Sequence, residues 1–392
     1  MKATYSMTRV FEQRIVDALD KRRAQNLTRR ELVTAGFSTK RFITPSSDFC
    51  NFASNDYLGL AGDNELILAF QEGAERFGVG SGASPLVTGH YSAHQMLVET
   101  ITDWLGYEDA ILFSSGFAAN QALLLSILHK DDLLIQDKLN HASLIEAGQM
   151  SAAKMVRFRH NDIQHLKTKL SDTQNNVVVT EGVFSMDGDV APLSDIQSVI
   201  ESQRDLLIVD DAHGVGVLGR NGKGSQEYWG VRPDVLVVTF GKAFGGSGAA
   251  ILCSSHMADY LRQFARHYIY STSLPPAIAF SMVKSISLIQ RDTWRREKLQ
   301  ALSSSFHEAL SDFPQVKVTM TPIKPIVVGS VERALKLSET LKQHGIWATA
   351  IRPPTVPTGE ARIRITLSVH HSQDEVTHLC KLLAAELNQL RS

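Results

Sequence analysis

The chain has few cysteines, almost no excess charge and no long apolar run, and each shortage excludes a class of protein. Its three cysteines, Cys50, Cys253 and Cys380, lie far apart without a C-x-x-C pair, which argues against a disulfide framework and a structural zinc site. The net charge of −1 gives no attraction to nucleic acid or anionic membranes. No apolar stretch reaches the roughly 20 residues that span a bilayer, and the N-terminus lacks a signal peptide's apolar core. We therefore expect a cytoplasmic protein without nucleic-acid or membrane partners.

The 392 residues are enough for two or three domains with real cores. From about residue 95, short runs rich in Val, Ile and Leu alternate with helical patterns. Runs without polar alternation are buried on both faces, so they predict an α/β fold with a mostly parallel sheet flanked by helices. The predicted strands cover residues 110–113, 132–136, 154–158, 177–180, 206–210, 235–240 and 249–253.

The two ends of the chain differ from this series. Residues 10–30 are amphipathic and rich in Arg and Lys, which predicts a helix packed on the body of the protein or on a partner subunit. Pro275-Pro276 ends the strand series, and one long helix is expected over 277–310. A smaller unit follows, with strands near 326–328, 347–351 and 362–367 and helices at 331–344 and 372–390. We expect an N-terminal helical segment (1–50), a large cofactor-binding domain (51–280) and a small α/β domain (281–392).

Two predicted strands end in reactive side chains. Strand 206–210 ends in Asp210 with His213 just beyond it, and strand 235–240 is followed by Lys242. Open α/β sheets bind ligands at the carboxyl ends of their strands. An amine held against apolar surroundings has a lowered pKa and attacks carbonyls. The pattern predicts a Schiff-base enzyme with pyridoxal 5'-phosphate (PLP), in which Asp210 holds the pyridine nitrogen protonated and His213 donates to the phenolate oxygen.

Three further features can carry chemistry. The segment Ser114-Ser-Gly-Phe-Ala-Ala-Asn120 opens a helix, and its small residues let backbone amides approach a phosphate. Phe117 in this segment would contact an aromatic ring, and His141 would stack on a planar cofactor. Arg362 and Arg364 share one face of a strand, so either would clamp a substrate carboxylate. Read singly, a capped helix start and solvated arginines explain the first and last of these features equally well, and a structural role explains a lone His141 better.

One motif points elsewhere. Gly214-Val-Gly-Val-Leu-Gly219 matches the G-x-G-x-x-G fingerprint of dinucleotide-binding proteins. That fingerprint requires a helix directly after it, whereas Arg220-Asn-Gly-Lys-Gly-Ser225 has the composition of a loop. A nucleotide-dependent oxidoreductase is therefore the less favoured alternative, and the glycines fit a loop close to a cofactor.

Seven short motifs extend from residue 54 to residue 275. They are Ser54-Asn-Asp-Tyr-Leu-Gly59, Gly80-Ser-Gly82, Asn140-His-Ala-Ser143, Thr180-Glu-Gly-Val-Phe-Ser-Met-Asp-Gly188, Val209-Asp-Asp-Ala-His-Gly214, Thr239-Phe-Gly-Lys242 and Ser271-Thr-Ser-Leu-Pro275. On these motifs the chain resembles the α-oxoamine synthases, which are fold-type I PLP-dependent transferases, from about Asn51 to the C-terminus. Within this family, the chain is most similar to the branch that uses L-alanine and a pimeloyl thioester. This closer resemblance lies in residues 18–23, 264–273 and 351–357. Ser84-Pro-Leu86 departs from it, because close relatives commonly have a Gly-His pair there.

The resemblance implies a role for each matching residue. Lys242 would form the Schiff base with PLP and later move the Cα proton, and it is counted as catalytic with His141, Asp210 and His213. His141 would stack on the cofactor ring. The remaining cofactor contacts implied are Gly116, Phe117, Ser185 and Thr239, with Thr272 reaching the phosphate from the other subunit of a homodimer.

The resemblance also implies the substrates. Arg364 would bind the amino-acid carboxylate, and Arg29 and Thr358 match positions that contact substrate. The implied reaction is a decarboxylating condensation of L-alanine with pimeloyl-CoA or a pimeloyl carrier protein. A glycine-using synthase, making 2-amino-3-oxobutyrate or 5-aminolevulinate, and a PLP aminotransferase of the same fold are the alternatives within PLP chemistry.

Overall fold

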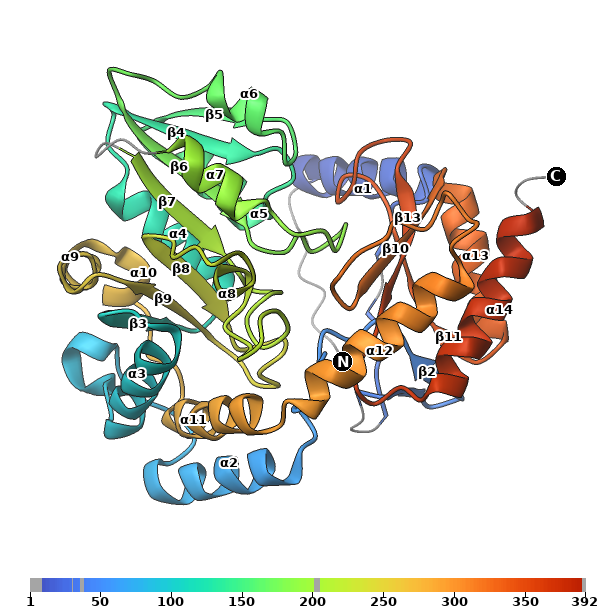
Figure 1. Ribbon diagram of the computed structural model, residues 1–392, viewed down its shortest axis with the longest axis horizontal. Helices are drawn as coiled ribbons and strands as arrows, with labels where there is room; N and C mark the ends of the chain where they lie inside the picture. Colours follow the sequence, from blue (N-terminus) through green and yellow to red (C-terminus); the bar gives the residue numbers. More distant parts are fainter. Residues whose placement is uncertain (1–8, 30, 36–38, 201–204, 390–392) are drawn as a thin grey trace.

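A seven-stranded sheet forms the centre of the larger part of the molecule (Figure 1). The computed structural model describes residues 9–29, 31–35, 39–200 and 205–389. The strand order is β3-β9-β8-β7-β6-β4-β5. The strands are β3 (Asp109–Phe113), β4 (Asp132–Asp137), β5 (Lys154–Phe158), β6 (Asn175–Glu181), β7 (Asp205–Asp210), β8 (Val235–Thr239) and β9 (Ala249–Cys253). Each lies where the apolar runs predict a strand.

The sheet is mostly parallel, as predicted, with one exception. Strands β5, β4, β6, β7 and β8 run parallel to one another, whereas β9 is antiparallel to both β8 and β3. Residues 240–248 join β8 to β9, which is too short for the crossover of about a dozen residues that parallel neighbours need. The direction of β9 therefore follows from the length of this connection.

Both faces of the sheet are buried. Ile135 and Val209 belong to one apolar core and their neighbours Leu134 and Ile208 to the other, because successive strand residues point to opposite faces. Figure 1 shows helices on both sides. The helices of this part are α2 (Asn64–Phe77), α3 (Ser92–Leu105), α4 (Gly116–Ile127), α5 (Ala142–Met150), α6 (Ile163–Lys167), α7 (Leu193–Val199), α8 (Ser225–Trp229), α9 (Ser255–Phe264) and α10 (Arg266–Ile269), with a π-helical turn η1 (Pro85–Gly89).

The prediction of one helix over 277–310 is wrong. Two helices, α11 (Pro276–Arg291) and α12 (Trp294–Ala309), are separated at Asp292. The Asp292 carboxylate accepts hydrogen bonds from Arg291 Nε at 2.7 Å and from Arg295 Nε at 3.2 Å. Aspartate competes with the helix backbone for such bonds and favours helix ends, so the ion pairs stabilise the break.

The smaller part contains two three-stranded sheets. One joins β1 (Arg41–Thr44), β2 (Ser47–Asn51) and β11 (Ile346–Trp347), and the other joins β10 (Ile323–Gly329), β13 (Ala361–Thr366) and β12 (Thr349–Ile351). The strand predicted over 347–351 is thus divided between two sheets at Ala348. Helices α12, α13 (Val331–Gln343) and α14 (Gln373–Gln389) lie beside these sheets (Figure 1). Because β2 pairs with β11, residues near 50 belong with the C-terminal part. The domain limits 1–50, 51–280 and 281–392 stay a prediction.

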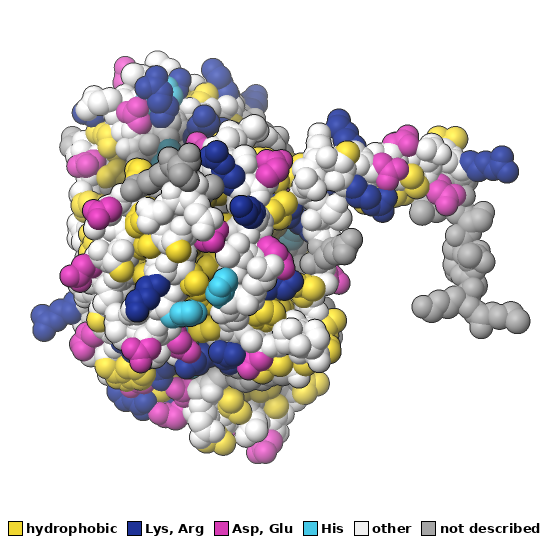
Figure 2. Space-filling model, turned by 90° about the vertical axis from the view of Figure 1, so that its right-hand side faces the viewer, with side chains coloured by type: hydrophobic (Ala, Val, Ile, Leu, Met, Phe, Trp, Pro, Cys, Tyr) yellow, Lys and Arg dark blue, Asp and Glu magenta, His cyan; other side chains and the backbone are white. Residues whose placement is uncertain are grey.

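The N-terminal helix is present, but it does not pack on the body of its own chain. Helix α1 (Arg9–Ala24) has no buried residue, and Figure 2 shows it projecting away from the molecule. Residue 30, the end of the predicted helix, lies outside the described residues. Among the helices that the structure describes, none combines the length and apolarity of a membrane span. The exposed apolar side chains of α1 are Val10, Phe11, Ile15, Val16 and Leu19.

Candidate active site

A cavity of about 930 Å³ lies where several strands of the large sheet end. It is walled by the segments that follow β3, β4, β6, β7 and β8 and by residues of the smaller part. This position is where open α/β sheets bind ligands. The predicted site residues among its walls are Arg29, Gly116, Phe117, His141, Ser185, Asp210, His213, Thr239, Lys242 and Arg364.

Lys242 follows β8 and is held at the cavity wall. Its Nζ donates a hydrogen bond to Thr239 Oγ1 at 3.3 Å. Burial lowers the pKa of Lys242; the negative charges of Asp210 and Glu181 oppose this shift, and Arg364 adds to it. A larger neutral fraction of the amine makes Lys242 a better nucleophile toward a carbonyl.

Asp210 ends β7 as a buried carboxylate with fixed orientation. Asn120 Nδ2 donates to its Oδ2 at 2.7 Å, and the Ala212 amide donates to its Oδ1 at 3.1 Å. Asn120, from α4, also donates to Ser143 Oγ at 2.9 Å, which is 2.8 Å from His141 Nδ1. Asn120 therefore ties the carboxylate to the segment that carries His141. The sequence motif contains Asn120, but only the packing of α4 on the sheet reveals this contact.

Glu181 is a second buried carboxyl group that the sequence patterns did not single out. It ends β6, beside Asp210 in the sheet, and lines the cavity. Its Oε2 accepts a hydrogen bond from the Ser185 amide at 3.3 Å, whereas its Oε1 has no partner among the described residues. Burial, together with the charge of Asp210, raises the pKa of Glu181 well above its usual value. When protonated, such a carboxyl group can donate as well as accept a hydrogen bond.

The two arginines of β13 have different surroundings. Arg362 is fully buried and forms ion pairs with Asp187 at 2.7 Å and Glu360 at 2.9 Å. Arg364 lines the cavity and donates to Ser185 O at 2.6 Å and Asn55 Oδ1 at 3.1 Å. No carboxylate of the described residues forms an ion pair with it. Of the two, Arg364 is the guanidinium available to an anionic substrate.

Two predicted site residues do not line this cavity. Thr358 is exposed, just beyond Pro357 at the cavity wall. Thr272 is also exposed and lies outside the cavity of its own chain. Arg29 does line the cavity, where its Nη2 donates to Thr355 Oγ1 at 3.1 Å.

The arrangement fits the chemical groups of PLP. Lys242 offers an amine to the aldehyde, and Asp210 offers a buried carboxylate to the pyridine nitrogen. The start of α4 at Gly116 and Phe117 offers backbone amides to a phosphate, whereas the Ala118 amide is capped by Ser115 Oγ. A Cβ on Gly116 would lie 2.5 Å from Thr239 Cγ2, so only glycine lets this helix start approach the end of β8. Residues that could hold a metal ion do not cluster within the described ranges.

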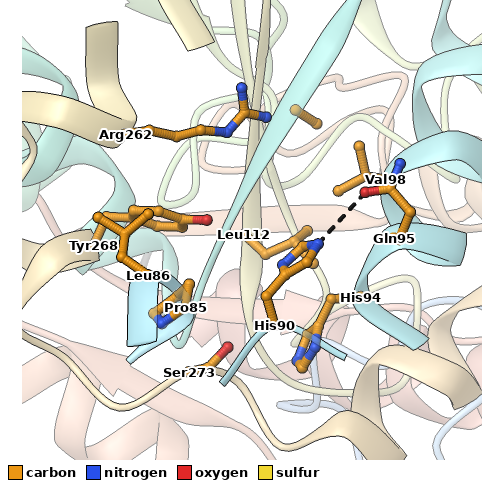
Figure 3. A pocket seen from close by; sticks show the side chains of 11 residues that line it. Pro85, Leu86, His90, His94, Gln95, Val98, Leu112, Arg262, Tyr268 and Ser273 are labelled. Carbon is orange, nitrogen blue, oxygen red and sulfur yellow. Dashed lines mark hydrogen bonds between the residues drawn. The ribbon is translucent and has the colours of Figure 1, made fainter. Parts of the chain in front are cut away.

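A second cavity, of about 310 Å³, lies between η1, α3, β3 and α10 (Figure 3). Three of its polar side chains have partners: His90 contacts Gln95 Oε1, His94 contacts Leu274 O at 2.7 Å, and Arg262 pairs with Asp109 at 2.8 Å. The charged and imidazole groups of this cavity are thus engaged within the protein, and it is smaller than the cavity at the strand ends. The chemistry therefore concentrates in the larger cavity.

Comparisons with known proteins agree with this site. Residues 47–383 match the family described as aminotransferase class I and II. An 8-amino-7-oxononanoate synthase of Vibrio cholerae serotype O1 is 54% identical over 377 residues, which cover 96% of this chain and 98% of that protein. The same enzyme from Francisella tularensis superposes with a TM-score of 0.78 at 30% identity, over 88% of this chain and 99% of that one.

A serine palmitoyltransferase from S. paucimobilis, solved with a bound PLP–myriocin aldimine, superposes with a TM-score of 0.90 at 26% identity, over 98% of this chain and 99% of that one. The fold is therefore that of fold-type I PLP enzymes, and the cofactor is pyridoxal 5'-phosphate. The sheet and the cavity with Lys242 agree with these relatives, and the relatives show that the chain belongs to the 8-amino-7-oxononanoate synthase family of PLP-dependent acyltransferases.

Proposed function

We propose that this protein condenses L-alanine with a pimeloyl thioester to give 8-amino-7-oxononanoate, CO2 and a free thiol, as a step of biotin biosynthesis. The observation that carries the proposal is one cavity that holds a nucleophilic amine, Lys242, and a guanidinium, Arg364, with which no carboxylate of the described residues pairs. The first suits a Schiff-base cofactor and the second an amino-acid carboxylate. The 54% identity to the Vibrio cholerae enzyme supports the choice of reaction.

The residues divide the chemistry between them. When bound, PLP supplies an electron-poor ring that accepts the electron pair left by the α-proton of the amino acid. Lys242 removes that proton and later returns it, because an amine with a lowered pKa can serve as base and then as acid. Asp210 keeps the pyridine nitrogen protonated. The alanine Cα bonds to the thioester carbonyl carbon as the C–S bond breaks, and the former alanine carboxylate then leaves as CO2.

Arg364 gives a test of where alanine binds. We expect Arg364→Gln to raise the KM for alanine about 10- to 100-fold, since a hydrogen bond to a charged group contributes roughly 1.5–3 kcal/mol. Steady-state kinetics with the thioester saturating measure the change. The matched variant is Arg362→Met, which breaks a buried ion pair and should lower the free energy of unfolding by roughly 3 kcal/mol. If Arg362→Met, and not Arg364→Gln, raises the KM, the carboxylate site is wrongly placed.

The mouth of the cavity supports an anionic acyl donor. Arg29, Lys138 and Arg157 all line it, and within the described part of the chain no carboxylate forms an ion pair with them. Arg157 donates instead to the Lys138 carbonyl. Unpaired cations attract the phosphates of a CoA or carrier-protein donor and the free carboxylate of a pimeloyl chain. Both kinds of pimeloyl donor therefore remain in the proposal.

A homodimer with shared sites is part of the proposal. Thr272 is exposed beside Tyr270, and the 79–87 segment lies next to both through a Ser273 amide bond to Ala83 O at 3.0 Å. Val79, Leu86, Val87 and Tyr270 are each at least half exposed. Exposed apolar side chains gathered near a predicted cofactor contact indicate a protein interface. A second copy that covered this face would bring its own Thr272 toward the cofactor phosphate, and helix α1 offers a further apolar surface.

Mixing two inactive variants tests this shared site. Lys242→Ala and Thr272→Ala are each expected to lose most activity. Refolded together, they form hybrid dimers with one intact site, and random pairing should restore about a quarter of wild-type activity. Light scattering should give twice the chain mass of 43.2 kDa. Mixtures that stay inactive, or a monomeric mass, would show that Thr272 does not act across an interface.

A panel of substrates tests the reaction itself. Release of CO2 should require both alanine and a pimeloyl thioester, and varying the carrier and the acyl length identifies the donor. If glycine turns over far faster than alanine, the protein is a glycine-using synthase. If an amino group is transferred without CO2 release, it is an aminotransferase.

A further inference from the structure

Tyr57 lies behind His213, outside the cavity. Its side chain is fully buried in the turn before α2, and its hydroxyl is 2.5 Å from His213 Nδ1. The same hydroxyl is 3.3 Å from Asn55 Oδ1, which accepts a hydrogen bond from Arg364 Nη1 at 3.1 Å. The Tyr57 hydroxyl thus lies between His213 Nδ1 and Asn55 Oδ1, and its single proton can be donated to only one of them.

Burial favours the neutral forms of both the Tyr57 and the His213 rings. Burial raises the pKa of Tyr57, against the opposing charge of Arg364. Burial, and then the charges of Lys242, Arg364 and His141, lowers the pKa of His213 well below its usual value. A neutral imidazole carries its single proton on either Nδ1 or Nε2, and the partner of one nitrogen decides the choice.

The distances favour one arrangement. Asn55 Oδ1 already accepts from Arg364, and its contact with the Tyr57 hydroxyl is the longer of the two, 3.3 Å against 2.5 Å. The phenol proton therefore lies toward His213 Nδ1, which places the imidazole proton on Nε2. His213 lines the cavity, so Nε2 is the nitrogen left to serve a cofactor there as a donor.

We propose that Tyr57 is a positioning residue that fixes His213 in the Nε2–H tautomer by donating its hydroxyl proton to Nδ1. The inference rests on the proposed function, in which His213 donates to the phenolate oxygen of PLP. Without the Tyr57 hydroxyl, Nδ1 would be a buried group with no partner. The imidazole could then place its proton on either nitrogen, and the donor to the cofactor would be lost part of the time.

The test compares two buried tyrosine hydroxyls in the PLP-loaded enzyme. Tyr57→Phe removes the hydroxyl that faces His213. Tyr107→Phe is the matched control, because Tyr107 is also buried and bonds Pro233 O at 3.0 Å and Gln226 Oε1 at 3.3 Å, away from the cavity. The readouts are the visible absorbance of bound PLP across the pH range, the kcat, the KM for alanine and the Tm.

We expect Tyr57→Phe to shift the pH titration of the PLP absorbance and to lower kcat on the order of tenfold, in line with the loss of one buried hydrogen bond. Tyr107→Phe should lower only the Tm. Adding Tyr57→Phe to His213→Asn should cause no further spectral change, since the hydroxyl acts through the imidazole. A Tyr57→Phe spectrum and kcat equal to wild type, or additive effects in the double variant, would overturn the proposal. The spectrum needs no acyl donor, so failure of the proposed reaction would be seen separately.

Discussion

Lys242→Ala is expected to abolish both turnover and the visible absorbance of lysine-bound PLP. The rate should fall by on the order of 10⁴-fold or more, because general acid–base catalysis alone contributes about 10²–10⁴-fold and the covalent anchor is lost as well. The variant should still fold, because Lys242 Nζ makes one hydrogen bond among the described residues, to Thr239 Oγ1 at 3.3 Å, and little stability is lost with it. Absorbance spectra and steady-state rates of the purified variant measure both effects.

Lys324 provides the matched control for this experiment. It is also buried, and burial lowers its pKa to about 7. Its Nζ, however, donates to Thr319 O at 2.8 Å and Thr319 Oγ1 at 3.1 Å, away from the cavity. Lys324→Met should keep the PLP absorbance. If Lys242→Ala retains the visible band, or Lys324→Met loses it, the assignment of the cofactor lysine is wrong.

Asp210→Asn is expected to lower kcat about 10²–10³-fold, the usual effect of removing one electrostatic group from an active site. An amide has nearly the same shape but cannot balance a protonated pyridine nitrogen. The loss should appear in kcat more than in the KM for alanine, because Arg364 still holds the carboxylate. Single-turnover measurements of α-proton exchange in alanine, without any acyl donor, isolate the affected step.

The neighbouring Asp211 provides a control, because its carboxyl group is buried close to Asp210 but does not line the cavity. It is fully buried, and burial raises its pKa to about 7. Its Oδ2 accepts from the Ser225 amide at 2.7 Å, and it does not line the cavity. Asp211→Asn should therefore change kcat only a few-fold. Equal losses in the two variants would show that general destabilisation of this segment, and not the charge of Asp210, causes the effect.

The buried strands were predictable because their signal is local. Continuous apolar runs such as Val235–Thr239 are enough to identify strands with two buried faces. The rule that ligands bind at strand ends then placed Asp210 and Lys242 at one site, and the structure brings both to one cavity. The break at Asp292 was missed although its partner Arg295 lies only three residues on, because an aspartate within a helical pattern weakens a helix without always ending it.

The missed parts of the site depend on contacts between distant segments. Asn120 reaches Asp210 at 2.7 Å because α4 packs on the sheet against β3 and against β8 and β9, which lie far from α4 in the sequence. The choice between Arg362 and Arg364 could not be made from their shared strand face. It depends on the 182–190 loop, whose Asp187 neutralises Arg362 and leaves Arg364 without a carboxylate. Sequence spacing finds which residues share a face, but not which of them a distant loop will pair.

The most direct test of the central claim follows the carboxyl carbon of alanine. The holoenzyme is given L-alanine labelled with ¹³C in its carboxylate, together with a pimeloyl thioester, and both CO2 and the organic product are analysed by mass spectrometry. The account predicts that all of the consumed label appears in CO2, with one free thiol per CO2 and an unlabelled 8-amino-7-oxononanoate. Label retained in pyruvate or in any other organic product, without release of the thiol, would contradict it.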